Sequence, residues 1–189
     1  LLSVGAMFMA TGPAGAEATA TRDTAAPALI VMRNEALRVE INLARGAHVT
    51  SCRYKGFEDA EIVFDWQVEN GGLFKDLWYL QGWPGEFDKR LYEAEIVKAG
   101  PDEAAVKTWT TSTGLSRGQA KDDIKDFLLE KTFVLRKGER ILTVNYGFTN
   151  KGEKGKRPAF WSQHVLDFDG QRKNNVYWRP TTHGADWID

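Results

Sequence analysis

The sequence contains one cysteine, Cys52, and only three histidines in 189 residues. A single cysteine excludes an internal disulfide and also excludes a CxxC redox or zinc motif. The formal net charge is −1. The chain therefore lacks the basic excess that favours binding to a nucleic-acid backbone or to an anionic membrane. No phosphate-cradling glycine loop and no nucleophile elbow occur, so neither nucleotide binding nor serine hydrolysis is indicated.

The chain also lacks helical periodicity, because no stretch keeps a 3.6-residue apolar repeat for three turns. Alternation with period two is present instead. In 36–41, Leu37, Val39 and Ile41 fall on one face, and 141–148 alternates in the same way. In that second segment the residues expected to point inward are Leu142, Val144, Tyr146 and Phe148. Further strands are predicted over 91–99, 104–110 and 127–136, with a hairpin turn at Lys137-Gly138. These short strands and short connections predict an all-β, antiparallel β-sandwich.

The N-terminus resembles a processing segment rather than a folded element. Residues 1–16, "LLSVGAMFMATGPAGA", are apolar, uncharged and too short to span a bilayer, and they end in the A-x-A pattern of a cleavage site. We interpret them as a partial signal peptide and expect the protein to be exported, to the periplasm or outside the cell. The alternative is a buried apolar helix, which the glycines and Pro13 disfavour. An Ala/Thr-rich linker is expected over 17–27 and the β-sandwich domain over 28–189.

Aromatic residues are abundant at 12%, with seven tryptophans. Residues 69–90, "ENGGLFKDLWYLQGWPGEFDKR", interrupt the strand pattern with aromatic side chains beside glycines and a proline. An indole face can pack on the C–H face of a sugar, while charged side chains bond its hydroxyls. The alternative is that the aromatic side chains only plug one end of the sandwich. The candidate sugar-binding residues in this segment are Trp78, Trp83, Glu86, Asp88 and Arg90.

His164 stands in the middle of a strand-like aromatic run, "RPAFWSQHVLDFDG" over 157–170. Period two puts Ser162 on the face of His164, and it puts Trp161 and Gln163, two more candidate sugar contacts, on the other face. Histidine is the one side chain whose ordinary pKa lies near neutrality, so it suits proton transfer at a cleft. The alternative is a half-buried histidine bonded to a backbone carbonyl.

Two segments carry a resemblance to a known superfamily. "VMRNEALRVEINLARGAHVTSCRYKG" (31–56) and "GERILTVNYGFTNKGEKGKRPAFWSQHVLDF" (138–168) resemble the opening and the later signature of the galactose-mutarotase-like β-supersandwich. The resemblance implies a supersandwich-like fold and carbohydrate binding or processing. It also implies that His164 is the histidine that protonates the sugar ring oxygen in aldose 1-epimerases.

The chain departs from that pattern in three places. The regions "ENGGLF" and "QGWPGEF" contain neither the family's first histidine nor its Asn-Arg pair. The family's catalytic base is a glutamate near the end of the domain, whereas this chain ends at "HGADWID" soon after His164. We therefore expect the N-terminal part of a larger supersandwich. A mutarotase-like or polysaccharide-processing activity stays open, and the competing class is a non-enzymatic structural or interaction domain with its tryptophans in the core.

No cofactor or metal is expected. "DFDG" (167–170) resembles half of a calcium loop but is interpreted as a turn, because the later oxygen ligands are absent. His183, Asp186 and Asp189 are spaced three apart beside the chain end and are interpreted as solvated. The expected partner is a mono- or polysaccharide, with no nucleic acid and no membrane after removal of the signal. The oligomeric state stays open.

Overall fold

The computed structural model describes most of the chain, with gaps in the loops and at the ends. The described residues are 2–7, 17–56, 59–64, 71–78, 85–116, 119–120, 125–156, 160–166, 177–181 and 184–188. Within them the regular structure is β-strand, with short 3-10 turns η1 (Leu43–Arg45) and η3 (Phe87–Lys89).

One five-stranded antiparallel sheet, here sheet I, contains the longest strands. Its order is β1-β13-β12-β9-β8. The hairpin of β12 and β13 turns at Lys137-Gly138, where Gly138 takes a positive φ of 74°. The bounds are β1 Leu2–Met7, β8 Glu93–Ala99, β9 Glu103–Thr111, β12 Phe127–Arg136 and β13 Ile141–Asn150.

The second five-stranded sheet, sheet II, is a meander in which each strand pairs with the next along the chain. Its strands are shorter than β9, β12 and β13. A register shift between Glu40 and Ile41 marks an irregularity opposite β5. The bounds are β2 Thr19–Arg22, β3 Leu29–Arg33, β4 Leu37–Asn42, β5 His48–Tyr54 and β6 Ala60–Glu61.

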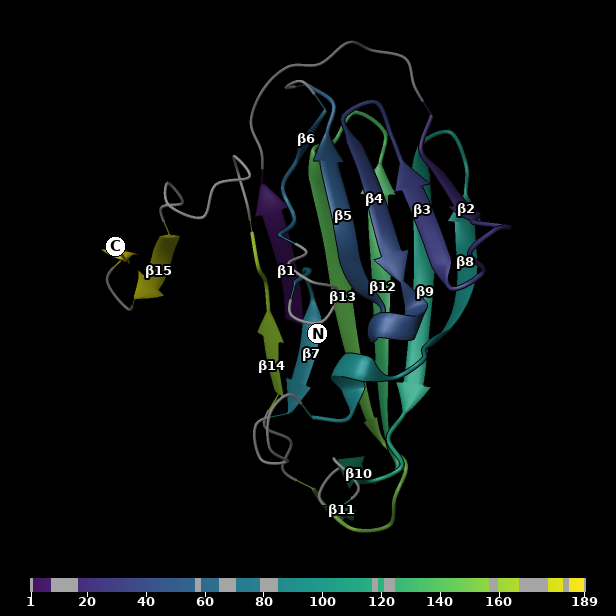
Figure 1. The fold of residues 1–189 in the computed structure, drawn as a ribbon, viewed down its shortest axis with the longest axis vertical. Coiled ribbons are helices and arrows are strands. Elements are labelled where there is room, and N and C mark those ends of the chain that lie inside the picture. The colour runs from purple at the N-terminus through teal and green to yellow at the C-terminus, as the bar shows by residue number, and fades with distance from the viewer. Residues whose placement is uncertain are drawn as a thin grey trace.

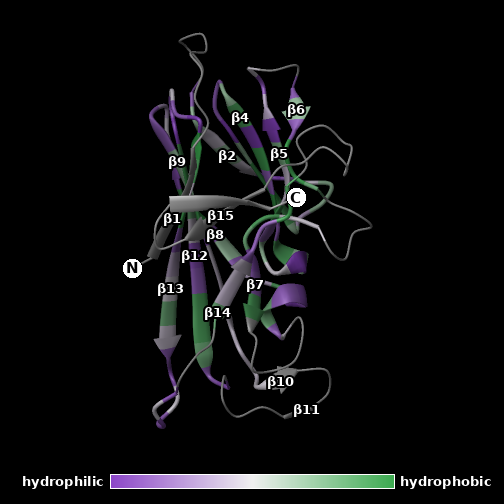
Figure 2. Cartoon of the chain, turned by 90° about the vertical axis from the view of Figure 1, so that its left-hand side faces the viewer, coloured by the Kyte–Doolittle hydropathy of each residue, from purple (hydrophilic) through white to green (hydrophobic). Residues whose placement is uncertain are grey.

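The two sheets face each other and enclose the hydrophobic core (Figures 1 and 2). Strand β4 shows why, because every second residue is buried and the residues between are half-buried. The alternation puts one row of apolar side chains on the inner face and leaves the charged row outside. Fully buried members of the core from both sheets are Ile30, Met32, Val39, Ile41, Val106, Leu129, Phe133, Leu135 and Val144.

Three two-stranded pairs complete the described structure. Strands β7 (Lys75–Trp78) and β14 (Phe160–Gln163) pair antiparallel and lie with η3 opposite the lower half of sheet I (Figure 2). The other two pairs are β10 (Leu115–Ser116) with β11 (Gln119–Ala120), and β15 (Tyr177–Thr181) with β16 (Gly184–Ile188).

The all-β antiparallel sandwich predicted from the sequence is confirmed, and β12 has the predicted bounds. Cys52 is a buried strand residue, and burial, with a contribution from Glu61, raises the pKa of its thiol to about 12. Phe148 lies on the predicted inner face, where its ring packs on Tyr146 and Phe160, but it is only partly covered and stays 37% exposed.

Strand β1 falls inside the segment that the sequence predicts to be a partial signal peptide. It pairs with β13 from Leu2 opposite Tyr146 to Met7 opposite Ile141. Cleavage after Ala16 would remove this strand and open that edge of β13.

Candidate functional site

The inner face of sheet I carries one polar cross-strand row among apolar ones. In one cross-strand row, Val106, Phe133 and Val144 supply apolar side chains to the core. The next row of the same face, two residues along each strand, is Thr108, Lys131 and Tyr146. An alternating strand pattern therefore carries a lysine into the interior.

Lys131 is completely buried and is surrounded by acceptors. Its Nζ lies 2.8 Å from Oδ2 of Asp76, which is also fully buried. The ammonium also donates to the carbonyl oxygens of Gly46 at 2.7 Å, Ala47 at 2.9 Å and Phe74 at 3.1 Å. Burial lowers the pKa of Lys131 and raises the pKa of Asp76, while the partner's charge opposes each shift. The charged form of each side chain is thus stabilised by the charge of its partner.

Two tyrosines flank the Asp76 carboxylate. The Tyr92 hydroxyl donates to Oδ2 of Asp76 at 2.9 Å inside the core. Tyr146, from the row of Lys131, is also buried. Burial and then the negative charge of Asp76 raise the pKa of both phenols well above the ordinary value, so both stay protonated as potential donors.

A chain of polar contacts leads from this buried group to the surface. The Tyr146 hydroxyl lies 3.2 Å from Oγ of Ser162, and Oγ of Ser162 lies 3.4 Å from Nε2 of His164. Asp76 and Ser162 occupy opposite positions in the β7–β14 pair, which explains why they meet sheet I on the same face. His164 itself is exposed. Ser162 and His164 therefore lie next to each other, as the sequence predicted.

The backbone of Phe74 connects the surface histidine with the buried lysine. Its N–H donates to Nδ1 of His164 at 3.3 Å, and its carbonyl accepts from Lys131. Phe74 has a φ of +57°, a left-handed conformation that is rare for a bulky residue and costs about 1–3 kcal/mol. Its ring meets that of His164 edge to face at 4.6 Å between centroids.

These contacts determine the protonation of His164. Because the Phe74 N–H needs the lone pair of Nδ1, the proton of the neutral ring sits on Nε2, facing Ser162. Partial burial against Phe74 and then the charge of Lys131 lower the pKa of His164. The ring is thus held as a neutral hydrogen-bond donor near pH 7.

Asp88, one of the predicted sugar contacts, lies inside the protein. Its Oδ1 is 3.5 Å from Nε2 of His48 and 3.5 Å from Nζ of Lys75, and all three side chains are nearly inaccessible. Burial raises the pKa of Asp88, although Lys75 opposes the shift. Burial also lowers the pKa of His48 well below 6.5, and the charges of Lys131, Lys75 and Arg45 add to that effect.

Glu86 and Arg90 join η3 to the end of β9. Glu86 accepts from Oγ of Ser112 at 2.5 Å, from the N–H of Thr113 at 2.8 Å and from the N–H of Gly114 at 3.1 Å. It also pairs with Arg90, whose Nε donates to Oγ1 of Thr110 at 3.0 Å. These two charged groups therefore bind the chain's own loop.

The tryptophans predicted to contact a sugar are only partly described by the structure. Trp161 is 48% exposed and lies, with half-buried Gln163, on the face of β14 opposite Ser162. Trp78 pairs with Phe160 at the end of β7, and nothing further of it is described. Trp83 lies outside the described residues. Next to Ser162, the ring of Phe160 packs on Phe148 at 4.7 Å and on Tyr146 at 5.2 Å between centroids.

Sequence reasoning missed Lys131, Asp76 and Tyr92. The period-two pattern of 127–136 contains the signal for Lys131, because it places Lys131 in register with buried Leu129 and Phe133. Asp76 had no comparable signal in its glycine-rich segment.

Among the described residues, no three histidine, cysteine or carboxylate side chains are grouped to hold a metal ion. The metal candidates at 167–170, His183 and Asp189 lie outside those residues, and Asp186 is in β16. No helix in the described part of the chain is long and apolar enough to span a membrane. The chain matches no known family in a scan against protein-family models, and it matches no curated protein.

Proposed function

We propose that this protein is an exported carbohydrate-binding domain of galactose-mutarotase-like type, with a binding surface along β14 and the adjoining end of β13. The observation that carries the proposal is His164. It is exposed and is held as a neutral donor by the Phe74 N–H and Ser162. Sugar hydroxyls bind to directed donors and acceptors beside an apolar face.

Aromatic side chains with open faces lie on the same strands. Phe148 is 37% exposed next to Phe160, and Trp161 is 48% exposed on the other face of β14. Each offers an apolar surface on which the C–H face of a pyranose can pack.

Binding is favoured over acid catalysis by the state of His164. An imidazolium donor would need a proton on Nδ1, where the Phe74 N–H already points, and it would face the charge of Lys131. Glu86 and Asp88, the only carboxylates the sequence offered nearby as a base, are bonded within the chain. Processing of a polysaccharide therefore needs residues other than these.

Glycan binding is tested by titrating the protein with a panel of mono- and oligosaccharides while recording tryptophan fluorescence and calorimetric heat. For a saccharide on the indole face of β14, Trp161→Ala should weaken binding by about 1–2 kcal/mol, the worth of one buried aromatic contact. For a saccharide on the face of Ser162, His164→Ala should weaken binding by about 1 kcal/mol, one neutral hydrogen bond. Lys107→Ala, which removes a side chain of β9 that is 40% exposed, is the surface control.

The competing function is a structural or interaction domain without a glycan ligand. The buried positions of Asp88 and Glu86 favour that class for the η3 region. If no saccharide in the panel binds, or if Trp161→Ala and His164→Ala leave every affinity unchanged, the carbohydrate proposal is wrong.

Export is proposed on the apolar segment 1–16 and its A-x-A end. Mass spectrometry of the N-terminus of protein recovered from the native host tests it. A mature chain starting near Glu17 supports export. A chain retaining 2–7 in the cell contradicts it and leaves β1 in place on β13.

A further inference from the structure

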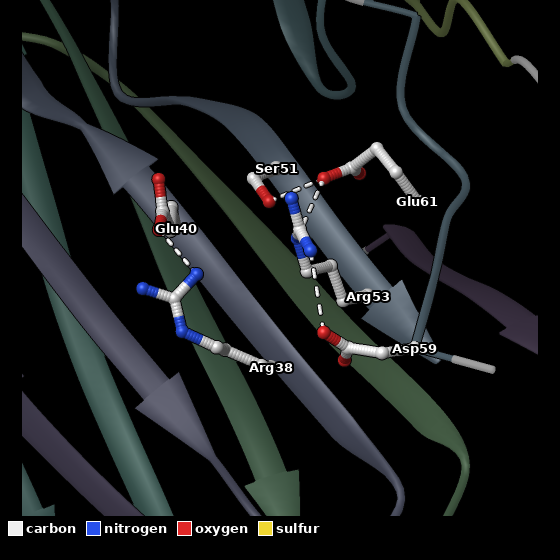
Figure 3. Close-up of a pocket in the computed structure, with 6 residues that line it drawn as sticks. All are labelled: Arg38, Glu40, Ser51, Arg53, Asp59 and Glu61. Carbon is white, nitrogen blue, oxygen red and sulfur yellow. Dashed lines mark hydrogen bonds and ion pairs between the residues drawn. The ribbon is translucent and has the colours of Figure 1, made fainter. Parts of the chain in front are cut away.

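A second surface of the molecule has the features of a ligand site. On the outer face of sheet II, away from the core, strands β4, β5 and β6 border a hollow of about 520 Å³ (Figure 3). Pockets of about 300–1,000 Å³ suit small ligands. The lining residues are all polar: Arg38, Glu40, Ser51, Arg53, Asp59 and Glu61.

Three arginines cross the sheet beside this hollow in one row. Arg33 of β3 is opposite Arg38 of β4, and Arg38 is opposite Arg53 of β5. Strands lie about 4.8 Å apart, and like charges directly opposite each other are destabilising. In the hollow, carboxylates that pair with Arg38 and Arg53 offset this repulsion.

The arginines in the hollow are held in place by carboxylates. Arg38 pairs with Glu40 (Figure 3). Arg53 contacts Asp59 at 3.2 Å and Glu61 at 3.5 Å, yet its side chain stays 45% exposed. The guanidinium groups are thus fixed in position but accessible.

Two of the carboxylates are themselves fixed. Glu61 accepts from Oγ of Ser51 at 2.5 Å, from the N–H of Cys52 at 2.7 Å and from the N–H of Val63 at 3.1 Å. Asp59 adopts a left-handed φ of +55° at the point where its carboxylate meets Arg53. Preorganised polar groups and a strained backbone are frequent at binding sites.

The mixture of charges defines the ligand chemistry. Two guanidiniums and three carboxylates line the hollow, so a simple anion meets repulsion from the carboxylates and a simple cation meets the arginines. A hydroxyl group fits both, because it accepts from a guanidinium N–H and donates its own hydrogen to a carboxylate. Adjacent hydroxyls on a rigid ring can make several such pairs at once.

We propose that this hollow, here the arginine site, binds a neutral saccharide through pairs of adjacent hydroxyls. It would be a second carbohydrate surface, on the far side of sheet II from the core. It extends the proposed function but does not depend on His164, since the two surfaces share no residue.

The test uses the whole chain and the signals of the arginine Nε–H groups in ¹H–¹⁵N spectra. Methyl β-glucopyranoside, methyl α-galactopyranoside and methyl α-mannopyranoside are the probes, and sodium sulfate is the anion control. At least one glycoside should shift the Arg38 and Arg53 signals with saturation. Arg53→Gln and Arg38→Gln should each raise the dissociation constant about tenfold or more, the effect of losing a charge-assisted hydrogen bond.

Arg136→Gln is the matched control, because the Arg136 side chain is 46% exposed, close to the 45% of Arg53, is bonded to the carboxylate of Glu103 at 2.9 Å, and does not line the arginine site. It should leave the affinity unchanged. The inference is overturned if no glycoside moves the Arg38 and Arg53 signals. It is also overturned if sulfate moves them as strongly as the sugars, or if Arg136→Gln has the same effect. A sugar that perturbs the signals of His164 and Trp161 but of neither arginine overturns the arginine site alone. A sugar that shifts the signals of Arg38 and Arg53 but not those of His164 and Trp161 overturns only the proposed β14 surface.

Discussion

Lys131 and Asp76 form an ion pair of 2.8 Å in which neither side chain reaches solvent. Fifty-five positions separate them in the chain, and the pair joins sheet I to strand β7. Removing one partner of such a pair leaves a buried charge without compensation. The contact therefore holds β7 and β14 against the lower half of sheet I.

Lys131→Met should lower the free energy of unfolding by about 3–5 kcal/mol, because Asp76 then stays buried without its counter-charge. Replacing both partners, Lys131→Met with Asp76→Leu, should cost less than the single change, since no charge remains to be desolvated. Urea unfolding of the three proteins measures both effects. A loss below about 1 kcal/mol for the single variant would show that Asp76 takes up a proton at little cost and that the pair is not needed.

Glu86→Ala should loosen the turn after β9. The carboxylate accepts from the backbone of Thr113 and Gly114 and from Ser112. Its removal takes this acceptor from the Thr113 N–H and the Ser112 hydroxyl, while the Gly114 N–H keeps Oγ of Ser112 at 3.1 Å. We expect a loss of about 1–3 kcal/mol and faster proteolytic cleavage in 112–126. Glu95→Ala, at an exposed position of β8, serves as the control and should change neither. Equal behaviour of the two variants would contradict an anchoring role for Glu86.

The stability that neutral His48 contributes should decline below about pH 6.5. The pKa of His48 in the folded protein lies well below the ordinary value of 6.5, because burial and then Lys131, Lys75 and Arg45 oppose its charge. Between these two pKa values the unfolded chain binds more protons than the folded one. The stability from neutral His48 is therefore full above pH 6.5 and is lost as the pH falls.

His48→Gln tests this pH dependence. Unfolding free energies measured between about pH 7.5 and pH 5 should fall less steeply in the variant, by up to about 1.4 kcal/mol per pH unit. His164→Gln is measured in parallel, because its lowered pKa acts in the same direction. Identical slopes in the wild-type protein and in His48→Gln would show that His48 already takes up its proton in the folded state.

Local patterns of the sequence predict the sheets well. Strand β12 and the hairpin at Lys137-Gly138 follow from alternation and from a glycine that takes a positive φ. The alternation of Leu37, Val39 and Ile41 likewise matches their burial. These features depend on neighbours a few residues apart, and such neighbours are visible in the sequence itself.

The contact partners of charged residues cannot be predicted from such local patterns. Glu86, Asp88 and Arg90 have the composition of a sugar site, but their contacts are made with Ser112, His48 and Thr110. Asp76 pairs with Lys131 of a distant strand, and two residues before Asp76 the backbone of Phe74 is left-handed, a conformation that no local rule assigns to phenylalanine. Such contacts depend on tertiary packing between distant segments.

The chain should not interconvert sugar anomers at the rate of an efficient epimerase. Mutarotation needs an acid at the ring oxygen and a base at the anomeric hydroxyl. His164 is held neutral, with the Phe74 N–H on Nδ1 and with its Nε2 proton directed at Ser162, so it is a poor acid at pH 7. Glu86 is bonded to the loop after β9, and Asp88 is buried beside His48 and Lys75.

Loss of one member of an acid–base pair commonly costs about 10²–10⁴ in rate. Polarimetry on freshly dissolved α-glucose and α-galactose should therefore show a rate close to that of buffer, and His164→Ala should leave it unchanged. A fast reaction abolished by His164→Ala would mean that the ring exchanges its bond to Phe74 for one to the sugar, and that a base outside the pairs described here completes the reaction.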